Sequence, residues 1–479
     1  MGSSVDKISL DEKYSFTAKA KRNIIILISV GLILSVIGAL MVKSGIGVEH
    51  HGHATEVKSE KNNSAEGNVE QKVAESEESQ KQSEEKIEMA NASKAEGKEQ
   101  HADHGHGHGP AVWVKRIIKN LWHNNVFFLG IAIIGVFFVA FNYVAQAGWG
   151  TLIKRIPEAF GYYLPVGAIL TIILILIGGH TLFHWMDSSL YDKTSPHYDE
   201  ILDSKTWWLN IPFFWARTIV FLAAWIGLWA LLRKFSVQED IEGGDKFFHK
   251  SNYWSATFLV VFGLSSSMLA WDWVMSMDPH FFSTMFGWYV FASWFVSGLA
   301  TITLVIILLK EAGYLKMVNE NHLHDMGKFM FAFSIFWTYI WFEQFLLIYY
   351  SNIPEEAFWF IERMRNWTYK PLWFTTFWLN FFFPFLALMT RESKRQSMIL
   401  KIVACVIIFG HWLDFYVMIT PPVLHNDGGL DFNWFFLELG IVMIFIGIFA
   451  YAILTGLSKA GLIPKKHPMI EESIYHHVY

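Results

Sequence analysis

The sequence predicts an all-α membrane protein that crosses the bilayer about ten times, with both chain ends in the cytoplasm. Hydrophobic residues make up 53% of the 479 residues and lie in long runs, which gives a mean hydropathy of +0.30. The 42 Phe and 22 Trp suit lipid-facing helix surfaces and the headgroup boundary. Along the chain, loops rich in Lys and Arg alternate with loops that are poor in these residues. The small net charge of -5 and the lack of a basic block exclude nucleic acid as an expected partner.

A run of about 20 apolar residues is long enough to cross roughly 30 Å of hydrocarbon as a helix. Such runs lie at residues 23–42, 126–147, 162–185, 213–232, 253–277, 286–309, 329–350, 372–390, 398–420 and 434–454. The first is too long for a secretory signal and no cleavage site follows it, so we interpret it as a retained anchor. The expected parts are a tail (1–22), the anchor (23–42), a linker (43–112), a membrane domain with nine spans (113–455) and a tail (456–479).

The distribution of basic residues predicts the orientation. With the N-terminus in the cytoplasm, Lys and Arg gather in the inside segments at residues 19–22, 154–155, 233–234, 310–316, 391–395 and 459–466. The outside loops 277–286 and 421–433 hold none. By the positive-inside rule, both ends are expected in the cytoplasm.

The linker at 43–112 is rich in Glu, Lys, Ser and Ala, and we expect it to be disordered outside the membrane. Its histidines, at positions 50, 51, 53, 101, 104, 106 and 108, allow weak divalent-metal binding, although a solvated tract is the favoured interpretation. In the segment after it, Val114, Ile117 and Trp122 fall on one helical face, and Arg116 and Lys119 on the other. This pattern predicts a helix lying on the membrane surface before the second span.

Several ionisable residues lie within the predicted spans. A charged side chain facing lipid at the bilayer centre costs about 2.5 to 3.5 kcal/mol on insertion scales, so each should face protein or water. The direction of each span places them all in the outer half of the bilayer, with Arg217 nearer the middle. They are His180, His184, Asp272, Glu343, His411, Asp414 and Glu438.

Helical spacing groups these residues. His411 and Asp414, three apart, share a face and are expected to share a proton path. His180 and His184, four apart, are also expected to share a face, as are Tyr339 and Glu343.

Each group also has a plainer interpretation. Arg217 is either an electrostatic partner for the proton-handling acids or one half of a structural ion pair. His184 is more often an interfacial hydrogen-bonding residue than a functional one. Glu438 lies early in its span, and we expect it to extend toward the headgroups.

The sequence also argues against several kinds of site. Cys405 is the single cysteine, so the chain alone predicts no disulfide, no thiolate-held zinc and no Fe–S cluster. Two histidines on one span do not supply the facing pairs that a membrane haem needs. No Walker loop or hydrolase serine motif occurs, so ATP-driven transport and hydrolysis are not predicted.

Three stretches resemble the ActF subunit of bacterial alternative complex III, whose membrane subunits are of the NrfD/PsrC type. They are AWDWVMSMDPHF at 270–281, HDMGK at 324–328 and WFEQ at 341–344. The resemblance runs from about Trp113 to the last span. It implies two four-helix bundles plus flanking helices, in a complex that oxidises quinol and passes electrons to cytochrome c or an oxidase.

The resemblance also implies the partners and cofactors. The partners would be a related ten-helix subunit, an Fe–S protein, c-type cytochromes, membrane lipids and in some cases a terminal oxidase. Haem c and Fe–S clusters would be held by those subunits, and the quinol or menaquinol site is usually placed in the related subunit. This chain would bind no redox cofactor alone, would not be catalytic by itself, and would scaffold the complex.

Three functional hypotheses therefore stand. The first is a membrane subunit of a quinol-oxidising complex, which conducts protons through a polar chamber in the outer half. Its proton-handling residues would be Asp272, Glu343, His411 and Asp414, with Arg217 as their partner and His180 and His184 as lesser candidates. The second is a quinol site within this chain, with His411 as proton acceptor. The third is a stand-alone ion-coupled transporter, which is disfavoured because transporter sites usually lie at the midplane.

Overall fold

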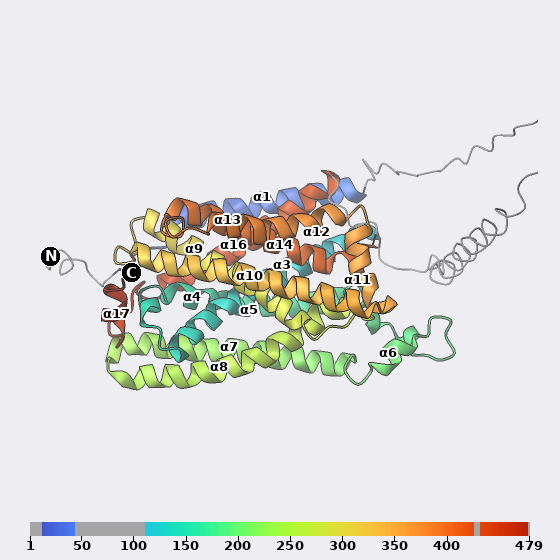
Figure 1. Cartoon of the computed structure of the whole chain (residues 1–479), viewed down its shortest axis with the longest axis horizontal. Helices are drawn as coiled ribbons and strands as arrows, with labels where there is room; N and C mark the ends of the chain where they lie inside the picture. The colour runs from blue at the N-terminus through green and yellow to red at the C-terminus, as the bar shows by residue number, and fades with distance from the viewer. Residues whose placement is uncertain (1–11, 44–110, 426–431, 478–479) are drawn as a thin grey trace, which may run out of the picture. The chain divides into compact units, whose positions relative to one another are not determined.

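The computed structural model describes residues 12–43, 111–425 and 432–477. Apart from Ala111, these residues belong to one compact unit, made of residues 1–46 and 112–479 (Figure 1). The predicted histidine-rich linker lies almost wholly outside the described residues, and so do all seven of its histidines.

The predicted all-α, multi-pass membrane fold is confirmed. Among the described residues, nine helical stretches are long and apolar enough to span a bilayer. They are α1 (Ala18–Lys43), α3 (Val112–Val144), α4 with α5 (Arg155–Phe160 and Leu164–Leu182), α7 (Ile211–Glu242), α8 (Asp245–Trp273), α9 (Phe286–Glu311), α10 (Glu320–Ser351), α14 (Ser397–Ile419) and α16 (Phe432–Ser458).

The remaining predicted span, at 372–390, is helical but interrupted. It consists of α12 (Lys370–Phe377), a π-helical turn η7 (Trp378–Phe382) and α13 (Phe383–Ala387). Pro384 has no N–H, and in a regular helix its ring would press on the carbonyl of Asn380, four residues earlier. A widened turn ending just before a proline relieves that clash, so the irregularity has a local cause in the sequence.

The spanning helices form two groups of four and one flanking pair. In the first group α3 packs on α5 and α8, and α7 packs on α8 and α5. In the second, α9 packs on α10 and α14, while α12, η7 and α13 lie against α14 and α10. The remaining pair, α1 and α16, packs closely together, and Gly38 of α1 lies against the main chain of Leu437. These contacts agree with the expected pair of four-helix bundles plus flanking helices.

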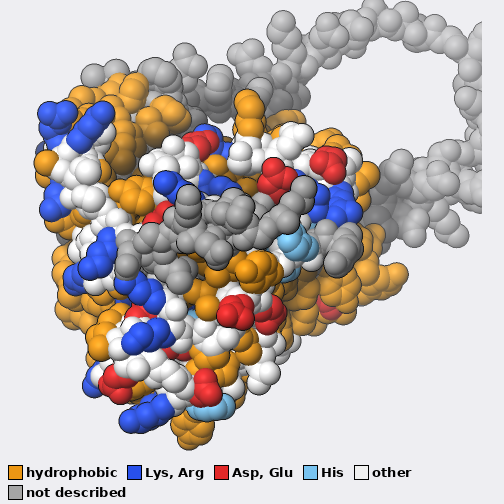
Figure 2. All heavy atoms as spheres, turned by 90° about the vertical axis from the view of Figure 1, so that its left-hand side faces the viewer, with side chains coloured by type: hydrophobic (Ala, Val, Ile, Leu, Met, Phe, Trp, Pro, Cys, Tyr) orange, Lys and Arg blue, Asp and Glu red, His pale blue; other side chains and the backbone are white. Residues whose placement is uncertain are grey.

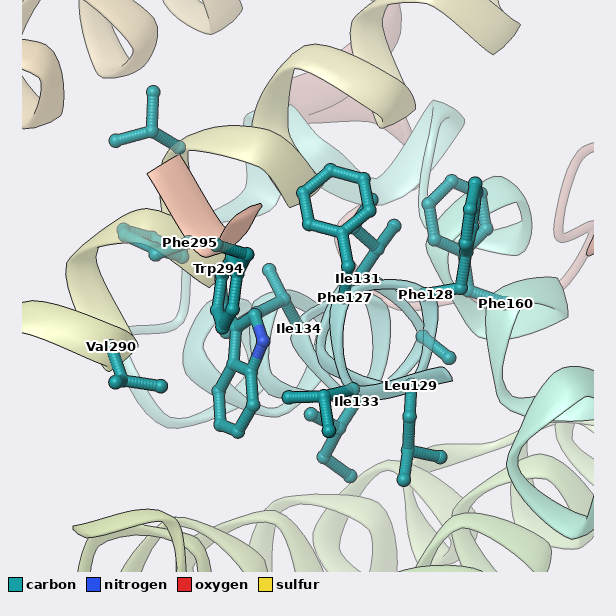
Figure 3. Close-up of a cluster of buried hydrophobic side chains, with 14 of the residues drawn as sticks. Phe127, Phe128, Leu129, Ile131, Ile133, Ile134, Phe160, Val290, Trp294 and Phe295 are labelled. Carbon is teal, nitrogen blue, oxygen red and sulfur yellow. The ribbon is translucent and has the colours of Figure 1, made fainter. Parts of the chain in front are cut away.

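The two groups are joined by α3 and α9 through a buried apolar cluster. Figure 3 shows Phe127, Phe128 and Ile134 of α3 packed with Trp294 of α9 and Phe160 of α4. The indole of Trp294 lies directly against the main chain of Gly130, where an added Cβ would come within about 2 Å of ring atoms. Only glycine allows this close approach.

The first and last described segments lie at the same end of the unit, which we call the terminal end. Leu462 donates its N–H to the Glu12 carbonyl at 2.8 Å, and α17 (Ile470–Ile474) lies at this end too (Figure 1). Figure 2 shows many Lys and Arg side chains here. The short helix α6 (Glu200–Ser204) and α11 (Pro354–Arg365) lie at the opposite end, which we call the α11 end.

Candidate proton-handling site

The second helix group encloses a hydrogen-bonded cluster that we call the His411–Asp414 site. His411 and Asp414 lie one turn apart on α14, with side chains 0% and 1% exposed. Tyr289 and Ser293 reach them from α9, and Trp337 reaches them from α10. The spacing of three along α14 places both groups on one helical face, as the sequence predicted, and the structure turns that face toward α9 and α10.

Asp414 accepts hydrogen bonds from three donors. The Tyr289 hydroxyl lies 2.5 Å from Oδ1, while Ser293 Oγ and Trp337 Nε1 each lie 3.0 Å from Oδ2. His411 Nδ1 is 2.9 Å from the same Ser293 oxygen. Its ring also meets the indole of Trp337 edge to face, with centroids 5.3 Å apart.

The hydrogen-bond directions assign the imidazole tautomer. A serine hydroxyl carries one proton, and an ionised Asp414 can only accept, so with Asp414 ionised Ser293 donates that proton to the carboxylate. Ser293 must then accept from His411, so Nδ1 carries the ring proton of the neutral imidazole and Nε2 is a bare acceptor. Nε2 is buried and has no hydrogen-bonding partner within the described residues.

This arrangement allows proton transfer over a short distance. His411 Nδ1 and Asp414 Oδ2 are 3.9 Å apart, with Ser293 Oγ between them as both acceptor and donor. A proton released by the imidazole can pass through the hydroxyl to the carboxylate, which is a general acid–base relay.

Asp272 and Arg217 form a separate site in the first helix group. The guanidinium binds the carboxylate twice, through Nε at 2.6 Å and Nη2 at 2.9 Å, and both side chains are buried. Trp208 adds a hydrogen bond from its indole to Asp272 and stacks on Arg217. The bidentate geometry fits the structural ion pair that the sequence left open, and any proton-handling role of these two residues stays a prediction.

His180 and His184 do not share a helical face, contrary to the sequence-based expectation. Helix α5 ends at Leu182 because Phe183 is extended, and His184 begins a separate 3-10 turn. Both side chains are exposed. His184 Nε2 meets the carbonyl of Pro422 at 3.1 Å, which suits the interfacial role that the sequence favoured for it.

Glu343 lies apart from the His411–Asp414 site. Its face of α10 points outward, since Tyr339 is 62% exposed and Phe342 is 51% exposed. Glu343 itself is partly buried, and its Oε2 is enclosed with no hydrogen-bonding partner in the described part of the chain. The predicted acids therefore lie toward the α11 end but at three separate places, and those places do not line a shared chamber.

The expectations for Glu438 and for the segment before the second span are wrong. Residues 112–144 form one continuous helix in which Arg116 and Lys119 are fully buried. Glu438 does not extend to the surface, because it accepts from Arg116 at 2.9 Å and from Tyr416 at 3.1 Å. Lys119 lies 3.5 Å from the same oxygen. The apparent amphipathic pattern arose because this polar face is turned toward α16 and α14, where the acid partner lies.

A further charged cluster, at the terminal end, was not singled out from the sequence. Glu158 binds Arg233 at 2.6 Å and Ser236, and Arg155 reaches Glu158 at 3.4 Å and Asp240 at 2.5 Å. The Lys and Arg residues there were used only as an orientation signal. The clue available in the sequence was that Glu and Asp residues occur in the same short segments and could form ion pairs with these Lys and Arg residues.

The same end holds a small cavity lined in part by Tyr143, Lys154, Phe248 and His467. Lys154 is held by Tyr143 at 2.6 Å and Glu239 at 3.0 Å. Burial, together with the charges of Lys154 and Arg155, lowers the pKa of His467 to about 2, so this imidazole is neutral at physiological pH.

A cluster of polar groups lies at the α11 end, beyond the His411–Asp414 site. Arg363 is fully buried and donates hydrogen bonds to the carbonyls of Val417 and Met418, in the last turn of α14. Burial lowers the pKa of Arg363 to about 10, while the charges of Glu362, Asp278, Tyr289 and Tyr369 act in the opposite direction. Burial raises the pKa of Asp278.

Comparison of the chain with protein-family models and with curated proteins finds no match. Across residues 12–43, 111–425 and 432–477, no group of three or more His, Cys, Asp or Glu side chains is arranged to hold a metal ion. The functional interpretation therefore depends on the geometry of the buried polar sites and on the resemblance noted in the sequence.

Proposed function

We propose that this chain is a membrane subunit of a quinol-oxidising electron-transfer complex of the alternative complex III type, and that it conducts or stores protons at the His411–Asp414 site. The observation that carries the proposal is the Asp414–Ser293–His411 arrangement, which is fully buried and ends in an imidazole nitrogen that has no partner in the described part of the chain. An acid and a base that are linked by a hydroxyl group inside a membrane helix group can pass a proton from one to the other.

The residues of the resembling stretches support this proposal only indirectly. Asp272 of the first stretch is bound by Arg217, Asp325 of the second lies 2.6 Å from both Lys328 and His476, and Gln344 of the third accepts from Ser283. These stretches thus carry structural contacts, which a subunit with a scaffolding role would preserve.

We further propose that the terminal end faces the cytoplasm and that the membrane is the bacterial inner membrane. The Lys and Arg side chains at the terminal end support this orientation by the positive-inside rule. The proposed partners remain the related ten-helix subunit, the Fe–S protein and c-type cytochromes, which would hold the haem and Fe–S groups, with lipids around the helices.

The first experiment is mild solubilisation of the full-length protein, followed by a search for haem-bearing partners in the same particle. Co-migration with c-type cytochromes is expected. Migration of the chain alone would contradict the proposed complex and favour the stand-alone transporter instead.

Replacing Asp414 with asparagine in the intact complex is expected to lower proton movement coupled to quinol oxidation by about tenfold or more, because the amide cannot take up the proton released by His411. The measurement is membrane potential together with quinol oxidation rate. Glu311→Gln is the matched control, because Glu311 forms an exposed ion pair with Lys401. If Asp414→Asn leaves both readouts at the control level, the proton role is lost.

One observation favours a second candidate, a quinol site within this chain. His411 Nε2 is a buried acceptor with no hydrogen-bonding partner among the described residues. A quinol needs such an acceptor for the proton of its hydroxyl group. Density for a quinone beside His411 at saturating ligand would support this function, whereas a site without quinone density under those conditions would argue against it.

A further inference from the structure

The π-helical turn η7 brings an asparagine to the His411–Asp414 site. Asn380 is fully buried, and its amide lies against the main chain of Gly410, the residue before His411. A Cβ on Gly410 would stand 2.1 Å from Asn380 Oδ1. Neither Oδ1 nor Nδ2 of Asn380 has a hydrogen-bonding partner among the described residues.

A serine of α10 adds to the same region. Ser334 is one turn before Trp337 on the same helical face, and Trp337 contacts both His411 and Asp414. Ser334 is also fully buried, and its hydroxyl is without a partner in the described chain. Because α10, η7 and α14 pack on one another, Ser334 and Asn380 lie on the two elements that pack against the helix carrying His411 and Asp414.

Buried hydrogen-bonding atoms left without partners are costly, so several of them together indicate a small bound ligand that can both donate and accept. Asn380 offers one donor group and one acceptor, Ser334 offers both, and His411 Nε2 offers an acceptor. Water matches this set, because a buried water typically makes about three hydrogen bonds to otherwise unpaired groups.

We propose that Asn380 and Ser334 hold internal water that delivers protons to His411 Nε2, which makes Asn380 a positioning residue for the relay. This inference rests on the proposed proton role of the His411–Asp414 site. It adds the route of entry, from the side of the site that faces η7.

The proton balance of the relay is simple. A hydronium at Nε2 gives up one proton and becomes water. His411 releases its Nδ1 proton to Ser293 Oγ, and Ser293 passes its own hydroxyl proton to Asp414. The net change is one hydronium converted to water and one carboxylate protonated, with the imidazole left in its other tautomer.

The test uses the full-length chain in lipid nanodiscs and two readouts. The first is the infrared O–H stretch of internal water, identified by its shift on exchange into H2(18)O. The second is the rate at which Asp414 gains a proton after a rapid acidification, followed by its carboxyl band. Asn380→Leu removes both polar atoms while keeping the number and branching of the side-chain heavy atoms, and Ser334→Ala is a smaller change that should fold readily.

Asn380→Leu and Ser334→Ala are expected to remove isotope-sensitive water bands and to slow Asp414 protonation by about tenfold or more. Thr376→Val is the matched control, because the Thr376 hydroxyl, one turn earlier along the same span, donates to the carbonyl of Trp373 within its own helix. Gly410→Ala should resemble Asn380→Leu, since its methyl group would displace the amide.

Water bands and protonation rates equal to the Thr376→Val control in both Asn380→Leu and Ser334→Ala would overturn the inference. A different result would defeat the proposed function itself: an Asp414 that never gains a proton in the unmodified chain. The two failures are therefore distinguishable in one set of measurements.

Discussion

Replacing Arg217 with methionine is expected to destabilise the protein by about 3 to 5 kcal/mol, because it leaves the buried carboxylate of Asp272 without its counter-charge. Asp272 is fully buried and receives both of its short contacts from this guanidinium, at 2.6 and 2.9 Å. The indole of Trp208 also donates to Asp272, at 3.1 Å, but it is uncharged and cannot neutralise the carboxylate. The measurement is reversible denaturation of the full-length protein in mixed micelles.

The double replacement Arg217→Met with Asp272→Leu separates the charge from the packing. It removes both charges at similar volume, so most of the lost stability is expected to return. If the double variant is as unstable as Arg217→Met alone, packing by the arginine stem would explain the loss, and the ion-pair account would be wrong.

Replacing Glu158 with leucine at the terminal end is expected to cost a similar amount, about 3 to 5 kcal/mol, because two buried guanidinium groups lose a shared carboxylate. Arg233 lies 2.6 Å from Glu158 and Arg155 lies 3.4 Å from it. Without Glu158, Arg155 keeps its ion pair with Asp240, whereas Arg233 keeps the uncharged carbonyl of Gly456 and its interaction with Tyr162. Denaturation in micelles is again the measurement.

Glu311→Gln provides the contrast for Glu158. Glu311 and Lys401 are also ion-paired, at 2.7 Å, but their side chains are 49% and 37% exposed. An exposed pair contributes roughly 0 to 1 kcal/mol, so little change is expected. Equal losses for Glu158→Leu and Glu311→Gln would contradict the dependence on burial.

The fold was largely predictable, because the length of an apolar run and the bilayer thickness together determine where a helix can span. The interruption of the span predicted at 372–390 was harder to foresee. Pro384 marked a local disturbance, but the sequence did not show that it would turn the amide of Asn380 against Gly410. Predicting that contact requires the packing of η7 on α14.

Only the part of the site that lies on a single helix, α14, could be predicted from the sequence. The spacing of His411 and Asp414 placed both on one face, and that expectation held. The partners Tyr289, Ser293 and Trp337 come from α9 and α10, and periodicity along a single helix carries no information about which helices meet.

The same limit explains the errors at Arg116 and Glu438. A polar stripe turned toward a buried acid on a distant helix has the same periodicity as one turned toward water. Only the contact between α3 and α16, residues separated by more than 300 positions, distinguishes the two cases.

The most direct test of the proposed relay is the infrared spectrum of the full-length protein in bilayers as the pH is lowered, with Asp414→Asn used to assign the carboxyl band and Ser293→Ala used to break the link. Proton exchange between His411 and Asp414 through Ser293 requires that the imidazole and carboxyl bands change together in the unmodified chain and separately in Ser293→Ala. Bands that change independently in both proteins, or an Asp414 band that does not respond to pH, would contradict it.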